Sequence, residues 1–378
     1  MTSVGAQLRA RFVNENLGGH ATVHIGIRAA LAEHPEVVAE VIDVPAPGAL
    51  GRVLRRPVPG LGSRDLDLAP LRAQLVLSSW VRRELRRRRS IPADVLHVYT
   101  QHAALLSIGE LRRIPSVVST DASGVQVARL HPDRAPTRHT ARRVALTSRL
   151  ERRVFDAATF VVAKSDWAAR SLRDDYRVPD DRLRIVRLGI VIPPAVVRHP
   201  PSGLPEVTFV ANSMSRKGGW RLLDLYRKHL RGRCVLNLVT PEYVAREPGV
   251  RVLGDIRPGD GRLEDVLART RVLAFPSEMD TFGIAALEAM AAEVPVVGFA
   301  MHALPEIVVD GETGFLVAEG DDAAFASAIG RLVDDAGLAC RMGQAGREQV
   351  NERFDARKST KRLLELLIEA RDLPPQAA

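Results

Sequence analysis

The chain has 378 residues, of which 46% are hydrophobic and 26% are charged. This length accommodates two domains of ordinary size, and this composition excludes a disordered or fibrous protein. No run of about 18 apolar residues occurs, which excludes a bilayer-spanning helix. Only Cys234 and Cys340 are present, which excludes a disulfide framework and a cysteine-based metal site. The first residues lack the build of a signal peptide, so we expect a cytoplasmic protein.

The formal net charge is +9, and nearly all of the 54 basic residues are arginines. Such an excess favours anionic partners, namely phosphate esters, an acidic membrane surface or nucleic acid. Aromatic residues make up only 4% of the chain. Because proteins that bind single strands use aromatic side chains as stacking platforms, we expect no nucleic acid partner.

Apolar runs of strand length alternate with helical patterns, which predicts a parallel α/β architecture. In the first half we expect strands at Leu8–Val13, Val38–Val44, Val95–Val98, Ser116–Thr120, Phe160–Ala163 and Leu183–Val186. The helices expected between them are Thr22–Ala32, Leu71–Arg88, Arg142–Ala157 and Trp167–Asp174. In the second half we expect strands at Val207–Val210, Val235–Val239, Val250–Leu253, Val272–Phe275 and Val294–Gly298. The helices expected there are Gly219–His229, Gly283–Ala292 and a final group from Asp321 to Ala370.

Two proline-rich segments, Pro193-Pro194 and residues 200–203, separate the two series. Proline interrupts helices and central strands, so we interpret this region as a linker between domains 1–192 and 203–356. Two similar α/β halves predict two facing Rossmann-like domains. In such sheets ligands bind beyond the carboxyl ends of the strands, so the expected site is an interdomain cleft.

The most informative segment runs from Val272 to Gly298 and reads as strand, polar turn, helix and strand. Asp280 lies in the turn, where it would cap a helix starting near Gly283. Glu288 lies two turns inside that helix. Free N–H groups at a helix start favour a bound anion or sugar hydroxyl, and a carboxylate can accept two hydrogen bonds from a ribose diol. The alternative is that Asp280 is only a cap and Glu288 a solvated helix residue.

This segment resembles the acidic motif of the family 4 retaining glycosyltransferases, in which seven residues separate two acids. Asp280 and Glu288 have that separation, and Asp stands where Glu is commoner. Pro276-Ser277, Phe282-Gly283 and the Leu-Glu-Ala-Met-Ala run at 287–291 also match. Glu278 is nearby but has the wrong spacing.

Other segments extend the resemblance over nearly the whole chain. They are residues 304–317, 209–219, 160–189 and the glycine pair Gly18-Gly19. Lys217 precedes two glycines that open a helix. A cation beside flexible backbone and a helix N-terminus is a phosphate-binding arrangement, whereas an isolated Lys-Gly-Gly is usually a surface turn.

Three positions depart from the family pattern. Asn212 stands where members often carry an arginine that binds the donor diphosphate, and Arg216, on the same loop, is the candidate replacement. Asp121 follows the fourth strand, where many members place a histidine. The segment from His302 to Leu304 lacks the paired glycines usual before Pro305.

The resemblance implies a GT-B fold and retaining, metal-independent transfer from a nucleotide-sugar donor to a sugar, lipid-linked or small-molecule acceptor. Lys217 and Arg216 would stabilise the departing diphosphate, and Asp280 would hold the donor sugar. Further candidate donor-binding residues are Gly18, Gly19, Asn212, Thr281, Phe282, Gly283 and Glu288. His20 and Asp121 are the acceptor-side candidates. The family also implies that the C-terminal helix, at 357–378, packs back on the first domain, and that neither metal nor cofactor is needed.

Alternative interpretations of the chain are another GT-B enzyme, such as a nucleotide-sugar epimerase or a phosphorylase, and an anion- or nucleic-acid-binding protein. The acidic pair Asp65 and Asp67 has the spacing of some metal-dependent transferases, but no apolar strand leads into it, so we expect a solvated loop. The basic run from Arg82 to Arg89 lies on a helix. Such a run is usually a solvated face; the alternative is peripheral contact with anionic lipids at the inner membrane surface.

Overall fold

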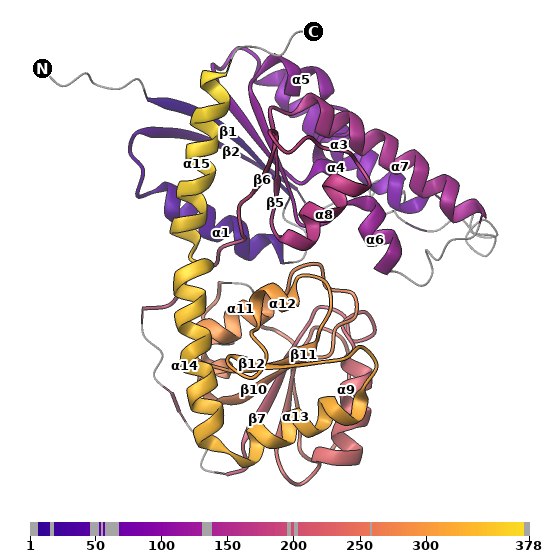
Figure 1. Cartoon of the computed structure of the whole chain (residues 1–378), viewed down its shortest axis with the longest axis vertical. Coiled ribbons are helices and arrows are strands. Elements are labelled where there is room, and N and C mark those ends of the chain that lie inside the picture. The colour runs from indigo at the N-terminus through magenta and orange to yellow at the C-terminus, as the bar shows by residue number, and fades with distance from the viewer. Residues whose placement is uncertain are drawn as a thin grey trace, which may run out of the picture. The chain divides into compact units, whose positions relative to one another are not determined.

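The computed structural model describes residues 7–15, 19–45, 53, 56, 68–130, 138–194, 198–199, 203–257 and 259–373. The chain divides into two compact units (Figure 1). Unit 1 comprises residues 1–188 and 359–378, and unit 2 comprises residues 189–358. The C-terminal segment therefore belongs to the same unit as the N-terminal half.

Unit 1 is built on a six-stranded sheet in the order β2-β1-β3-β4-β5-β6, in which all neighbours are parallel. Its strands are β1 Leu8–Glu15, β2 Val37–Val44, β3 Val95–Tyr99, β4 Ser116–Thr120, β5 Phe160–Ala163 and β6 Leu183–Ile185. Its helices are α1 His20–Leu31, α3 Ala69–Arg87, α4 Gln101–Ala104, α5 Ile108–Arg113, α6 Gly124–Leu130, α7 Arg138–Ala157, α8 Asp166–Asp174 and most of α15 Ala356–Asp372. The central strands are buried at every residue, as expected of a parallel sheet covered on both faces.

Unit 2 repeats this plan with the strand order β12-β11-β10-β7-β8-β9. Its strands are β7 Glu206–Val210, β8 Val235–Val239, β9 Val250–Leu253, β10 Thr270–Phe275, β11 Val296–Phe299 and β12 Gly314–Val317. Its helices are α9 Gly219–Leu225, the π-helical turn η3 Tyr226–Leu230, α10 Arg262–Arg269, α11 Ile284–Ala291, α12 Leu304–Ile307, α13 Asp322–Asp334 and α14 Ala336–Arg353. Strand β7 lies between β10 and β8, so the loops after β7 and β10 emerge side by side.

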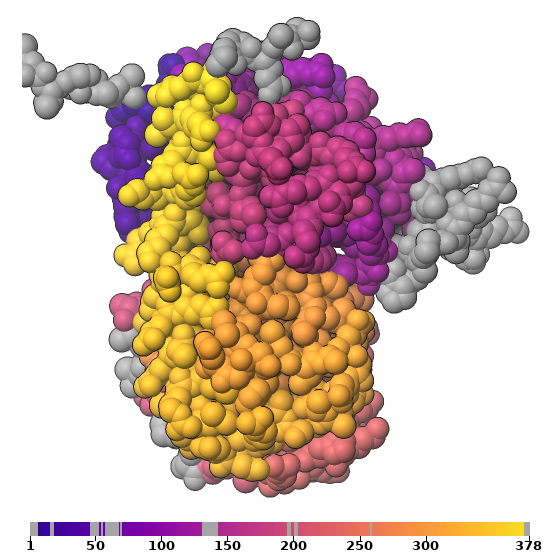
Figure 2. Space-filling model, in the orientation of Figure 1, coloured from indigo at the N-terminus to yellow at the C-terminus, as the bar shows by residue number. Residues whose placement is uncertain are grey.

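Every strand expected from the sequence is present, and two parallel Rossmann-like sheets confirm the predicted α/β class. Strand β12 was not expected. Residues 359–372 of α15 lie on the surface of unit 1, where Figure 2 shows them in yellow between indigo N-terminal residues and magenta residues. Among the described residues, no helix is both long and apolar enough to cross a membrane. The acidic pair at positions 65 and 67 lies outside the described residues.

Candidate active site

Two neighbouring loops of unit 2 approach each other closely because of a glycine. Gly218 follows β7, adopts a left-handed conformation (φ +76°) and is the N-cap of α9. A Cβ atom at this position would lie 2.3 Å from the carbonyl oxygen of Pro276, in the loop after β10. Both the backbone angle and this contact require glycine at position 218. The close approach of the two loops therefore depends on this residue.

These loops bring together Lys217 and Asp280, the two charged residues at the centre of the predicted site. Lys217 Nζ donates a hydrogen bond to Asp280 Oδ2 at 2.6 Å. The side chains remain 18% and 21% exposed, so both reach solvent. A cation and a carboxylate therefore lie together at the carboxyl edge of the sheet, where ligands bind in α/β proteins.

The expectation that Asp280 caps the following helix is wrong. Helix α11 begins with Gly283 at its N-cap, in a left-handed conformation with φ +106°. Asp280 lies three residues earlier, and its carboxylate is directed to Lys217. The side chain therefore has a contact that a simple helix cap does not require.

Arg216 lies beside Lys217 in the chain but its side chain takes a different direction. Its guanidinium donates to Asn212 Oδ1 at 3.3 Å, and both residues are exposed. Arg216 also lines a pocket of about 170 Å³ together with Met214, Ser215, Gly218, Trp220, Arg221, Pro276, Glu278 and Met279. The structure thus places Arg216 beside the Lys217 loop but pairs it with Asn212 rather than with Asp280.

Glu278, the acid with the wrong spacing, forms a separate ion-pair group. Arg221 bonds to the carboxylate of Glu278, and its Nε donates to Asp322 Oδ1 at 2.5 Å. Nε2 of His302 lies 2.9 Å from the backbone carbonyl oxygen of Glu278. These contacts hold the loop after β10 against α9, α13 and the loop after β11.

The remaining donor-side candidates surround the start of α11. Phe282 is 4% exposed and packs edge-on against Phe354 with ring centroids 6.3 Å apart, so only its backbone can face a ligand. Thr281 and Glu288 are partly buried, with Glu288 in the second turn of α11. These residues follow Asp280 on one continuous segment.

In unit 1, polar side chains gather where parallel strands end. Glu15 is the last residue of β1, Tyr99 is the last of β3, Asp121 follows β4 and Lys164 follows β5. Because the carboxyl ends of parallel strands meet at one edge, residues distant in the chain become neighbours here.

The two acceptor-side candidates meet at this edge. His20 Nε2 lies 3.4 Å from Asp121 Oδ2, and their side chains are 19% and 17% exposed. Burial opposes the charged imidazole, but the hydrogen bond and charge of Asp121 and the charge of Glu15 outweigh it, so the pKa of His20 is raised. Gly19 is the N-cap of α1, and Gly18 lies outside the described residues.

Three residues of this edge were not singled out from the sequence: Glu15, Tyr99 and Lys164. Lys164 is only 4% exposed, and its Nζ lies 5.6 Å from the centroid of the Tyr99 ring. Burial lowers the pKa of Lys164 to about 8, although the charge of Asp121 opposes this shift. Glu15 accepts a hydrogen bond from Thr100 Oγ1 at 2.5 Å. The available signal was a polar residue at the end of each apolar strand or directly after it.

A buried acid, Glu151 of α7, supports the same edge. It is fully buried and accepts a hydrogen bond from the backbone N–H of Gly124, at the start of α6. It also bonds to Tyr176 and lies 2.9 Å from His102 Nε2. Burial disfavours the charged carboxylate, but the hydrogen bonds from His102, Tyr176 and Gln101 more than compensate, so the pKa of Glu151 is lowered.

Within the described ranges, no three His, Cys, Asp or Glu side chains are grouped so as to hold a metal ion. Each unit thus carries its own candidate region: a cation–carboxylate pair on unit 2 and a polar strand edge on unit 1.

Comparison with known proteins gives matches over most of the chain. A family model described as "Glycosyltransferase Family 4" matches residues 18–192, and one described as "Glycosyl transferases group 1" matches residues 205–335. The chain is 30% identical to an alpha-maltose-1-phosphate synthase of Mycobacterium tuberculosis over 387 residues, which covers 92% of this chain and 95% of that enzyme.

A second relative matches over a shorter region. The chain is 34% identical over 191 residues to a D-inositol 3-phosphate glycosyltransferase of Streptomyces avermitilis, covering 46% of this chain and 39% of that enzyme. The chain therefore matches less than two thirds of the length of that relative. Among solved structures, HepE of Anabaena in complex with UDP-glucose superposes with a TM-score of 0.67 at 18% identity, over 96% of this chain and 100% of that one.

The HepE superposition confirms the GT-B fold, and the synthase matches this chain over nearly the whole length of both. This chain therefore belongs to family 4 of the glycosyltransferases.

Proposed function

We propose that the enzyme moves a sugar from a nucleotide-sugar donor to a hydroxyl group of its acceptor, with retention at the anomeric carbon and without a metal or cofactor. The observation that carries this proposal is the Lys217–Asp280 pair at the carboxyl edge of the unit 2 sheet. It places a cation and a carboxylate together, as an extended donor with an anionic diphosphate and a neutral sugar requires.

The departing nucleoside diphosphate gains negative charge as the glycosidic bond breaks. Lys217 is positioned to stabilise that charge, together with the positive end of the α9 dipole that follows it. Arg216 is a second cation on the same loop, and its partner Asn212 is neutral, so a diphosphate can draw it away without breaking an ion pair. In this proposal, these groups provide the positive charge that a bound divalent cation provides in metal-dependent transferases.

The two acids of the motif serve different parts of the donor in this proposal. Asp280 lies in the loop before α11 and contacts hydroxyls of the donor sugar, where its charge also favours the positive charge that develops at the anomeric carbon. Glu288 lies inside α11 and accepts hydrogen bonds from the ribose diol.

On unit 1, the His20–Asp121 pair is proposed to orient the acceptor hydroxyl. An imidazole whose pKa is raised can accept and return a proton near neutral pH, and the Asp121 carboxylate holds this ring by its contact with Nε2. The charge of Lys164 interacts favourably with that of Asp121.

The names of the similar proteins suggest where to begin with substrates. UDP-glucose is bound by HepE, and phosphate-bearing compounds appear in the names of both relatives. We therefore propose a UDP-sugar as the first donor to test, with sugar phosphates first among sugar, lipid-linked and small-molecule acceptors.

The test is a screen of donor hydrolysis and transfer with UDP-, GDP-, ADP- and dTDP-sugars, carried out with and without a chelator. Transfer that survives the chelator and conserves anomeric configuration supports the proposal. Loss of activity with the chelator, or inversion of the product, contradicts it. Formation of an isomerised free nucleotide sugar would instead identify an epimerase.

A further inference from the structure

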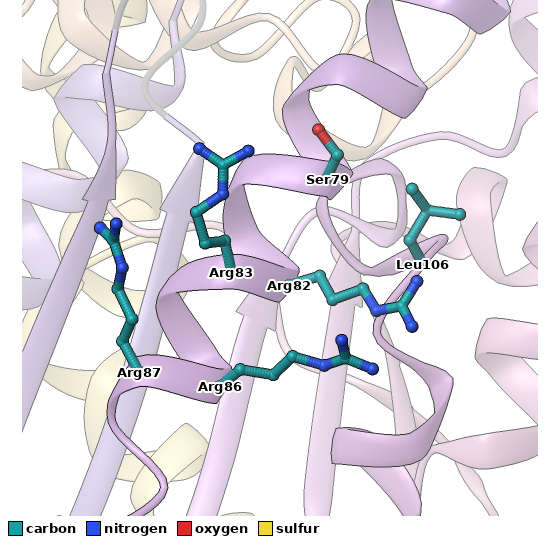
Figure 3. A pocket seen from close by; sticks show the side chains of 6 residues that line it. All are labelled: Ser79, Arg82, Arg83, Arg86, Arg87 and Leu106. Atoms are coloured by element: carbon teal, nitrogen blue, oxygen red, sulfur yellow. The ribbon is translucent and has the colours of Figure 1, made fainter.

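Helix α3 presents a row of arginines along one face. Polar and basic residues occur at spacings of three and four along this helix, which places them on one side of it. They are Ser79, Arg82, Arg83, Arg86 and Arg87. They line a pocket of about 540 Å³ together with Leu106 (Figure 3). Arg82 and Arg86 extend to the same side as Leu106, so the pocket is walled by guanidinium groups.

The opposite face of α3 is fixed in the core of unit 1. Leu77, Val81 and Leu85 are buried there, and Trp80 packs against the same core. The helix therefore has no free apolar face with which to insert into another medium. Only its basic face is available for contact.

The charges in this pocket are unbalanced within the described part of the chain. Glu84 forms an ion pair with Arg87 at 2.9 Å and another with Arg88. Both oxygens of this carboxylate are therefore already paired. Arg82, Arg83 and Arg86 form no ion pair or hydrogen bond with any described residue, and no acid lines the pocket. Like charges three and four residues apart destabilise a helix, so a bound anion would relieve this repulsion.

We propose that this pocket docks the chain electrostatically on the phosphate groups of an anionic lipid surface. A planar guanidinium donates two parallel hydrogen bonds to a phosphate, which makes arginine well suited to this ligand. Residues 79–87 extend about 12 Å along the helix axis, a row suited to several phosphates presented side by side rather than to one. Among the described residues, none that lines the pocket has an aromatic side chain to stack on a base, which favours lipid headgroups over nucleotides or single strands.

This docking adds a membrane-contact surface to the transferase and does not depend on its proposed reaction. Since the apolar face of α3 is buried, the contact consists of charge alone and should weaken steeply with salt. Each basic residue near an anionic surface contributes about 1 kcal/mol, or roughly fivefold in affinity. Loss of three arginines should therefore weaken binding on the order of 100-fold.

The experiment is co-sedimentation of the full chain with vesicles of phosphatidylcholine containing about one third phosphatidylglycerol, compared with vesicles of phosphatidylcholine alone. The test variant is Arg82→Gln, Arg83→Gln, Arg86→Gln. The charge-matched control is Arg153→Gln, Arg231→Gln, Arg341→Gln, which removes three exposed arginines on other elements. Circular dichroism verifies that both variants are folded, and inorganic pyrophosphate and a short oligonucleotide serve as soluble probes.

The expected result is that the parent and the control bind only the vesicles with phosphatidylglycerol, that about 0.5 M salt releases them, and that the test variant does not bind. Equal binding by the test variant and the control would overturn the proposal, since general positive charge would then be sufficient. Absence of vesicle binding by the parent would also overturn it. So would binding of pyrophosphate or the oligonucleotide, without vesicles, that depends on the three arginines.

Discussion

Lys217 and Asp280 are 63 residues apart in the chain, yet their side chains form a 2.6 Å ion pair. Each lies in a loop that leaves the carboxyl end of a strand, and β7 and β10 are neighbours in the sheet. In the proposed reaction, the diphosphate and the sugar of the donor meet at this pair. Removing either charge leaves the other side chain without this partner. The effect of a variant at one position therefore includes a change at the other.

Replacing Lys217 with alanine should lower turnover by about 2–4 kcal/mol in transition-state free energy, because its contact strengthens as the leaving group gains charge. The fold should be little affected, since the side chain belongs to a loop, is partly exposed and packs in neither sheet. Steady-state kinetics with a verified donor measures the effect, and Lys228→Ala, an exposed lysine in η3, is the matched control. Unchanged kinetics in Lys217→Ala would show that the loop is only a turn.

Asp280→Asn keeps the size of the side chain and removes its charge. Turnover should fall at least about tenfold, or 1.4 kcal/mol, if the carboxylate supports the charge that develops at the anomeric carbon. Affinity for the bare nucleoside diphosphate should not fall, because the variant also releases Lys217 from its partner. Turnover and nucleotide affinity are measured in the same preparation. A parallel loss of both, or of neither, removes Asp280 from the sugar site.

Glu288→Ala should weaken binding of the free nucleoside diphosphate, because the ribose diol loses its hydrogen-bond acceptor. Titration calorimetry with the nucleotide alone isolates this effect from the sugar. Glu312→Ala, which removes an exposed acid of the same unit, controls for the change in net charge. If both variants bind the nucleotide like the parent, Glu288 serves only the helix.

Gly218→Ala should destabilise unit 2 and abolish donor binding. Its left-handed backbone costs an alanine about 1–2 kcal/mol, and the added Cβ would meet Pro276 at 2.3 Å. Gly261→Ala is the matched control, because Gly261 is also a helix N-cap with φ +80° but has nothing within 4 Å of the added Cβ atom. The difference between the two variants therefore measures the cost of the contact with Pro276. Urea unfolding should rank Gly218→Ala as the less stable by at least about 1 kcal/mol. Equal stability would mean that the two loops can separate without cost.

Asp121→Asn should lower the pKa of His20, because burial then acts with less opposition. In the parent the folded pKa is raised. The stability that His20 contributes is therefore complete below its unfolded pKa and is lost as pH rises through its folded pKa. An NMR titration of the imidazole measures the change, with His34, which pairs with Glu36, as internal control. A His20 titration that is identical in both proteins would contradict the assigned contact.

The sequence was sufficient for the strands because most are continuous apolar runs bounded by turn residues. Strand β12 was missed because it begins at Gly314. A Cβ atom there would lie 2.0 Å from the carbonyl oxygen of Val296, so this glycine serves the approach of β12 to β11. In a sequence, such a glycine looks like part of a turn.

The site was predictable where its residues share one segment, and less so where the sheet assembles them. The spacing of Asp280 and Glu288 is visible in the chain. The pairing of Lys217 with Asp280 depends on the order β10-β7, which no local pattern contains. The expectation of a cap at Asp280 failed because the left-handed Gly283 begins α11 instead. Lys164 was overlooked because only burial distinguishes it from a surface lysine.

Helix α15 has a consequence for how the protein is made. Leu363, Leu366 and Leu367 are at most 1% exposed, and they belong to the unit that begins at the N-terminus. The first 188 residues therefore emerge from the ribosome before the helix that covers them has been synthesised. The apolar surface that receives these leucines stays open while all of unit 2 is synthesised, so completion of the first unit waits until α15 has left the exit tunnel. Nascent chains stalled before position 356 should accordingly recruit chaperones that recognise exposed apolar surface.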